Sequence, residues 1–365
     1  MPRPAADLLR PDRRRRALRW ALTLALGTVG GLAARALGLP LPWLIGALMA
    51  VGAASASGLR LAGGPPDFPQ TLREYCIPVI GVLIGGTFTP ETLSGALAWW
   101  PGLIAAIAFV PTALLANYVL FSRFGGLSRP TAFFAGMPGG LVEAIELGAE
   151  NGADARPLTV LQFTRVVLVV TALPLLFSLV EGRALGSAAG VSVAREGAGL
   201  GLVDVLVLTA SGALGYRFAT RWGLPAGRII GPIFASGAVH AAGLTDAAPP
   251  AFLVAAAQLV IGTGLGLRFV GLERRELARY LRLSAASVAL MLAIAAAFSS
   301  VAAAAGAAPF GIMMLALAPG GVVEMGLVAL SLNANPIFVT LHHLVRILAA
   351  VGAGVGLWRL VGRGG

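Results

Sequence analysis

Two stretches of the chain carry the same unusual set of residues. Met137–Arg165 and Ala318–Arg346 align without a gap at an offset of 181 residues. Each contains Pro-Gly-Gly, a glutamate three residues later and an arginine at its end. Pro-Gly-Gly breaks a helix and leaves free backbone N–H groups where the next helix starts, which favours an anion. Glutamate can bind a proton or a cation, and arginine can bind an anionic group through its planar guanidinium. These residues are therefore candidates for an ion or solute site that the chain builds twice.

The aligned positions define the candidate site residues. Broken helices at the middle of a membrane are places where transport proteins bind solutes and ions. Thr159 and Thr340 are secondary candidates because they align, as are Gln162 and His343, three residues before each arginine. The primary candidates are Pro138, Gly139, Gly140, Glu143 and Arg165 in the first copy, and Pro319, Gly320, Gly321, Glu324 and Arg346 in the second.

Each candidate has an alternative explanation that the sequence leaves open. Pro-Gly-Gly can be only a turn that lets helices pack closely. The glutamates can couple to a proton or cation, or they can complement the positive end of a helix dipole. The two arginines can bind an anionic solute or pair with the glutamates, because a charge at membrane depth needs a partner. His343 can relay protons or form a hydrogen bond that supports packing.

The composition indicates a membrane protein. The chain has 365 residues, of which 57% are hydrophobic and 12% are charged, whereas soluble domains carry about 25% charged residues. Apolar runs of about 20 residues recur, as in transmembrane helices, and the alternation of about ten residues that marks a transmembrane barrel is missing. We therefore expect an all-α polytopic membrane protein with the lipid bilayer as its main partner.

Few residues suit a metal, a cofactor or a catalytic centre. The single Cys76 excludes an internal disulfide and a cysteine-rich metal site, and three histidines are too few for a multi-histidine enzyme. We expect no metal, no cofactor and no enzymatic activity. The net charge of +11 comes from arginines that we assign to loops between helices, so we expect no direct nucleic-acid partner.

The duplication extends over most of the chain. Gly38–Gly46 matches Gly223–Gly231 at an offset of 185, and Ile80–Phe88 matches Ile261–Phe269 at 181. The basic and apolar start resembles a signal peptide, but it belongs to the repeated unit and is expected to be retained as a span. The predicted parts are a basic cytoplasmic N-terminus (1–16), a first membrane repeat (17–182), a linker (183–203) and a second membrane repeat (204–361).

Arginine positions predict how the two repeats cross the membrane. Each repeat has six apolar elements, and cytoplasmic loops are enriched in arginine. If all twelve elements cross, 15 loop arginines lie inside and 10 outside. If the fifth element of each repeat (130–150 and 309–332) enters and leaves by the same face, the counts become 22 and 3. We therefore predict inverted repeats with about ten crossings, two re-entrant Pro-Gly-Gly hairpins and both termini in the cytoplasm of a bacterial inner membrane.

Glycines at matching positions predict close helix packing. Gly81 and Gly85 form a GxxxG pair, and Gly262 and Gly266 form the equivalent pair in the second repeat. This spacing lets helices approach closely. We expect these glycines to pack helices within the chain rather than between chains.

The duplicated Pro-Gly-Gly-x-x-Glu, the arginine that follows it and the paired Gly-Leu-Pro segments resemble the AbrB-type integral membrane family with a tandem AbrB domain. Proteins of this kind are labelled ammonia monooxygenases or regulators of gene expression. The monooxygenase label fits this sequence poorly because a copper or iron centre needs a cluster of ligands. The resemblance implies no substrate.

Two functions from different classes stay open. The first is a secondary transporter of a small, anionic solute, coupled to a proton or cation, with its site at the hairpin tips. The second is a membrane-embedded sensor that acts indirectly on gene expression. Duplicated hairpins that oppose each other favour the transporter. An oligomer is compatible with either.

Overall fold

The computed structural model describes residues 13–89, 95–181, 200–224, 226–271, 273–332 and 334–361. These residues form helices joined by turns, with one isolated bridge between Leu61 and Gly64. Within them, seven helical segments are long and apolar enough to cross a membrane: Arg13–Ala36, Ala96–Arg123, Ala155–Leu179, Leu202–Arg221, Ala251–Phe269, Arg275–Ala304 and Pro336–Val361. The prediction of an all-α, multi-pass membrane protein is confirmed.

The helices form two series of similar order. The first series is α1 (Arg13–Ala36), α2 (Pro42–Ser57), α3 (Gln70–Gly85), η2 (Ala96–Trp99) with α5 (Trp100–Arg123), α6 (Arg129–Ala135), α7 (Leu141–Glu150) and α8 (Ala155–Glu181). The second is α9 (Leu202–Arg221), α10 (Gly227–Ala241), α11 (Ala251–Gly266) with η3 (Leu267–Phe269), α12 (Arg274–Ala304), α13 (Phe310–Leu317), α14 (Val322–Ser331) and α15 (Pro336–Val361).

Some helices are shorter than the apolar runs of about 20 residues found in the sequence. The fifth element of each repeat is a pair of short helices, α6 with α7 and α13 with α14, separated at Pro-Gly-Gly. Helices α2 and α3 have 16 residues each and α10 has 15, and helices of that size reach only about 22–24 Å. The number of crossings therefore stays a prediction. The predicted N-terminal part (1–16) and linker (183–203) fall largely outside the described residues, which do not include 1–12 and 182–199.

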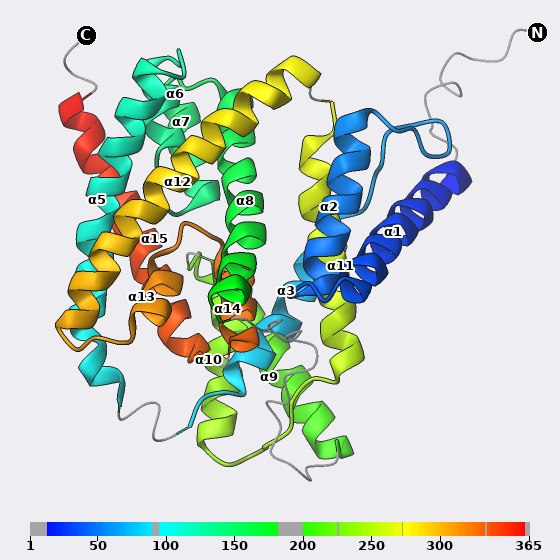
Figure 1. Cartoon of the computed structure of the whole chain (residues 1–365). Coiled ribbons are helices and arrows are strands. Elements are labelled where there is room, and N and C mark those ends of the chain that lie inside the picture. Colours follow the sequence, from blue (N-terminus) through cyan, green and yellow to red (C-terminus); the bar gives the residue numbers. More distant parts are fainter. Residues whose placement is uncertain are drawn as a thin grey trace, which may run out of the picture.

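The helices pack into two bundles, and each bundle takes helices from both series (Figure 1). The first bundle contains α1, α2, α3, α9, α10 and α11, and the second contains α5 to α8 and α12 to α15. The main contacts between the bundles join α3 to α14 and α15, α2 to α8 and α12, and η3 to α8. Helix α3 thus lies against the second broken segment, which becomes important for the site.

The predicted glycine pairs hold the first bundle together. A Cβ on Gly81 would lie 2.8 Å from the Cβ of Pro232 and 2.9 Å from the carbonyl oxygen of Ile229, so α3 and α10 approach at a distance that only glycine allows. On α11, a Cβ on Gly266 would lie 2.7 Å from the backbone nitrogen of Gly52 on α2. The expectation that these glycines pack helices within the chain is confirmed.

We predict that Gly81→Leu destabilises the protein, because a larger side chain must push α3 away from α10. Overpacking of this kind costs about 1–3 kcal/mol. The measurement is thermal unfolding of purified protein in one detergent. The matched control is Gly356→Leu on α15, where a Cβ would meet nothing within 4 Å and leucine improves helix propensity. Equal melting temperatures for the two variants would contradict the packing explanation.

Candidate functional site

The first broken segment ends a helix inside the protein. Helix α6 stops at Ala135, and the last carbonyl groups of a helix have no partner within it. The side-chain nitrogen Nε2 of Gln162 on α8 donates hydrogen bonds to the carbonyl oxygens of Phe134 (2.9 Å) and Ala135 (3.3 Å). Nη1 of Arg165, one turn further along α8, donates to the carbonyl oxygen of Met137. Two side chains of α8 therefore bond the carbonyl groups that the break exposes.

Arg346 on α15 does the same at the second broken segment. Its Nη1 donates to the carbonyl oxygen of Leu317 (3.1 Å) and to that of Ala318. Its Nη2 donates to the carbonyl oxygen of Gly320 (2.9 Å). Arg346 has 1% of its surface exposed and Arg165 has 4%, so both charges are held inside the protein.

His343 takes the place that Gln162 has in the first series. Its Nε2 lies 3.2 Å from the carbonyl oxygen of Leu315, and its Nδ1 lies 3.0 Å from Nη2 of Arg346. A guanidinium can only donate, so Nδ1 accepts and Nε2–H donates. His343 therefore orients Arg346 and bonds α13, which supports the packing interpretation.

The hypothesis that the arginines pair with Glu143 or Glu324 is contradicted. Within the described ranges, no ion pair joins Arg165 or Arg346 to a carboxylate. Their acceptors are neutral backbone oxygens and a histidine nitrogen. In addition, the Nε atoms of both arginines are buried without a hydrogen-bond partner. The two positive charges are therefore not neutralised by the nearby glutamates.

The two tips meet at Arg346. A Cβ on Gly139 would lie 3.5 Å from the carbonyl oxygen of Arg346 and 3.5 Å from Cα of Ile347, so the first tip rests on α15. The side chain of Arg346 at the same time holds the second tip through Gly320. Arg165 bonds the carbonyl oxygen of Met137, directly before the first tip. Both broken segments thus contact the turn of α15 that carries Arg346, and each is bonded by a buried arginine.

The glutamates lie at the first turns of α7 and α14, and each folds back toward its own tip. A Cβ on Gly140 would lie 3.1 Å from Oε2 of Glu143, and Glu324 crowds Gly321 even more closely. A carboxylate there complements the positive end of the helix dipole, as the alternative explanation proposed. The two differ in burial, because Glu143 is half-buried and Glu324 has 3% of its surface exposed.

The remaining candidates are placed around the tips. Gly140 has φ of 65°, a left-handed conformation that favours glycine, whereas Gly321 is extended with φ of −81°. Thr340 is buried and its hydroxyl has no hydrogen-bond partner, and Thr159 is half-buried. Pro138, Gly139 and Pro319 are buried, and Gly320 is half-buried.

One residue near the site was missed by the sequence reasoning. Arg73, counted there among the loop arginines, lies on α3, and its Nη2 is 3.9 Å from Oε1 of Glu324. It occupies the position that Val254 has in the second repeat. An arginine in the polar first turn of α3, next to Glu74, gave no clear signal in the sequence, and only the fold shows that α3 packs against α14.

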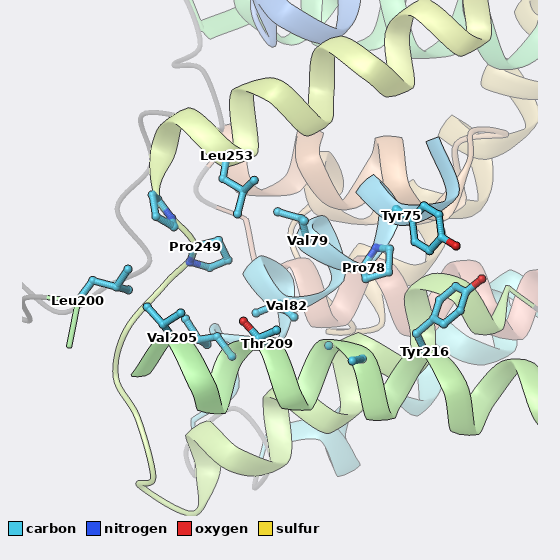
Figure 2. Close-up of a pocket in the computed structure, with 14 residues that line it drawn as sticks. Tyr75, Pro78, Val79, Val82, Leu200, Val205, Thr209, Tyr216, Pro249 and Leu253 are labelled. Carbon is cyan, nitrogen blue, oxygen red and sulfur yellow. The ribbon is translucent and has the colours of Figure 1, made fainter. Parts of the chain in front are cut away.

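A separate cavity of about 580 Å³ lies between α3, α9 and α11. Figure 2 shows Tyr75 and Tyr216 at one end of it and Leu200 and Pro249 at the other. Its lining is almost entirely apolar, and Tyr75 at its mouth is 72% exposed. An apolar cavity offers nothing to offset the desolvation of a charged solute. The polar tips are therefore the better candidate for a site that binds an ion or an anionic solute.

We predict that Arg346→Leu strongly destabilises the protein, because the carbonyl groups of Leu317, Ala318 and Gly320 would lose their partner. An unsatisfied buried polar group costs about 1–3 kcal/mol, and three are affected. The measurement is the melting temperature of purified protein in detergent. The control is Arg359→Leu, near the exposed end of the same helix, which should melt close to the wild type. A small and equal effect of both variants would show that the carbonyl contacts are not structural.

Comparisons with known proteins agree with this architecture. The sequence model of one protein family, described as "AbrB: Transition state regulatory protein AbrB", matches residues 43–362. The chain is 25% identical over 362 residues to "Uncharacterized protein YhjN" of Bacillus subtilis (strain 168), covering 93% of this chain and 92% of that protein. It is 24% identical over 357 residues to "Putative regulator AbrB" of Escherichia coli (strain K12), covering 94% of this chain and 97% of that one. The chain belongs to the AbrB family.

Proposed function

We propose that the chain is a secondary transporter of a small anionic solute, with its site where the two Pro-Gly-Gly tips meet. The observation that carries this proposal is the pair of buried arginines, Arg165 and Arg346, bonded to backbone oxygens rather than to carboxylates. Buried charge without a countercharge is expensive in a membrane. An anion that enters between the tips would offset that cost.

The proposed arrangement is an inverted repeat, with about ten crossings and two re-entrant hairpins. Matching helices have matching close contacts: α1 approaches α2 at Gly30 and Gly46, and α9 approaches α10 at Gly215 and Gly231. The broken pairs α6–α7 and α13–α14 lie toward opposite ends of the second bundle in Figure 1. The start of α1 and the end of α15 lie toward the same end in that view, in keeping with two cytoplasmic termini in a bacterial inner membrane.

The tips supply groups that suit transport. Irregular backbone at membrane depth is tolerated only inside protein or beside a water-filled cavity. Glu143 and Glu324, one turn beyond each tip, are then the carboxylates that can carry a coupling proton or cation. The ring of His343 beside Arg346 is bonded on both nitrogens, so it supports the second tip rather than acting on a solute.

A membrane-embedded sensor or regulator is the second candidate. The relative from Escherichia coli is named a regulator, and the family description also refers to regulation. A sensor would bind the same solute at the same tips but would not move it across the membrane. Uptake by the purified protein therefore separates the two candidates.

We predict solute-dependent charge movement in proteoliposomes that contain the purified protein. Acetate, succinate and citrate would be tested by electrical recording on a supported membrane. A responding anion should give a current that Glu324→Gln and Glu143→Gln reduce at least about tenfold, equivalent to about 1.4 kcal/mol. Glu146→Gln is the matched control, because Glu146 is an exposed glutamate on the same short helix as Glu143. Wild-type currents in all three variants would place the transport site elsewhere, and binding without current would favour the sensor.

We also predict that equivalent loops of the two repeats lie on opposite sides of the membrane. Gly126, between α5 and α6, and Gly306, between α12 and α13, are both exposed glycines with positive φ. In a Cys76→Ser background, an impermeant maleimide should label Gly306→Cys in intact cells. It should label Gly126→Cys only after the membrane is permeabilised. Labelling of both positions under the same condition would exclude the inverted arrangement.

A further inference from the structure

One ion pair connects the two bundles beside the second tip. Nη2 of Arg73 on α3 lies 3.9 Å from Oε1 of Glu324 on α14. The pair is asymmetric between the repeats, because the position equivalent to Arg73 is Val254, an apolar residue. Glu143 consequently has no arginine of this kind opposite it. A feature present at only one tip does not follow from the duplication and calls for its own explanation.

The pair leaves Arg73 only partly bonded. A distance of 3.9 Å is longer than the 2.7–2.9 Å of a charge-assisted hydrogen bond, and Nε of Arg73 is buried without a partner. The side chain of Arg73 is 24% exposed, whereas that of Glu324 is 4% exposed. The side chain of Arg73 is therefore partly accessible while it faces a deeply buried carboxylate.

A second cation lies at the junction of the bundles. Arg268 is exposed and lies in η3, which directly follows α11 and contacts α8. Its guanidinium lies over the ring of Phe163 on α8, 4.3 Å from the ring centre. Of these two arginines only Arg73 is paired with Glu324 in the described part of the chain, so the junction of the bundles carries an excess of positive charge. Such a local excess of positive charge attracts anions.

The neighbouring helix makes room for Arg73. A Cβ on Gly264 of α11 would lie 3.0 Å from Cδ of Arg73 and 3.7 Å from Oε1 of Gln70. The equivalent position in the first repeat is Leu83, whose side chain would not leave that space. Glycine therefore lets the arginine side chain lie across α11 on its way to α14.

We propose that Arg73 binds the carboxylate group of the transported solute, in competition with the carboxylate of Glu324. This inference rests on the proposed transport function and adds the chemical class of its substrate, an organic carboxylate. The structure already places a carboxylate against Arg73, and that carboxylate belongs to the protein. A solute carboxylate that displaces Glu324 gains the unused donors of Arg73 and the nearby charge of Arg268. It also separates α3 from α14, so binding is linked to a rearrangement between the two bundles.

The test uses sodium acetate as the probe and the melting temperature of the purified full chain as the readout. Sodium chloride at equal ionic strength corrects for screening. Acetate should raise the melting temperature of the wild type, because a ligand that binds the folded state stabilises it. Glu324→Gln should respond at about tenfold lower acetate concentration, because the internal competitor is neutral. Arg73→Gln should lose the response, and Arg73→Lys should keep a weakened one, because lysine retains the charge without the fork.

A matched control uses the other ion pair of α3. Arg228→Gln removes the partner of Glu74, which lies 2.8 Å away in an exposed pair, and it should leave the acetate response unchanged. An unchanged response in Arg73→Gln, or no gain in Glu324→Gln, would overturn the proposal. So would the lack of a response in both the wild type and Glu324→Gln. Glu324→Gln and Arg73→Lys keep the test decisive if Arg73→Gln does not fold. Acetate binding without uptake would count against transport alone, and uptake without acetate binding would count against this inference alone.

Discussion

A helix that ends inside a membrane protein leaves carbonyl groups without partners, and neither lipid nor a packed core can supply a donor. This chain meets the requirement twice with a side-chain pair from the long helix that follows each break. Gln162 and Arg165 bond the end of α6, and His343 and Arg346 bond the end of α13. Arginine suits this role because its five donors can reach several carbonyl groups at once. The broken segments therefore depend on these bonds to satisfy the carbonyl groups at their ends.

This solution has an electrostatic consequence. The arginines satisfy neutral acceptors, so their charges stay uncompensated near the point where the tips meet. The first tip rests on α15 at Arg346, which also holds the second tip. A positive centre bounded by two broken helices is suited to an anion, and the glutamates next to it belong to the starts of α7 and α14. The proposed anionic solute thus follows from how the backbone is satisfied.

The junction between the bundles adds a different constraint. Helix α3 carries Arg73 to Glu324, while close glycine contacts fix α3 against α10. All ten residues of α14 are buried, so any movement of α14 relative to α3 must break contacts between the bundles. In the proposed mechanism, an ion pair that a solute can replace gives that movement a chemical trigger.

Much of the fold could be predicted from the sequence, but the hydrogen bonds of the buried arginines and the ion pair of Arg73 could not. The breaks at Pro138 and Pro319 were predictable because proline and glycine act locally on the backbone, and the matched arginines were predictable because the stretch is duplicated. The partners of Arg165 and Arg346 were not, since a carbonyl acceptor leaves no mark on residue type. Arg73 was missed because its contact with Glu324 spans helices far apart in sequence and occurs in one repeat only. The short helices α2, α3 and α10 also show that apolar length read from sequence overestimates helix length.

The convergence of the tips on α15 is the central claim, and a disulfide tests it most directly. Gly139→Cys and Ile347→Cys, combined with Cys76→Ser, place two thiols at the contact between the first tip and the turn that carries Arg346. Two cysteines form a disulfide only when their Cα atoms lie within about 7 Å. Mild oxidation of the purified protein should join them, so that the fragments from a protease cut between the two repeats stay linked until reduction. Fragments that separate without reduction, from a variant that folds like the wild type, would show that the tips do not meet on α15.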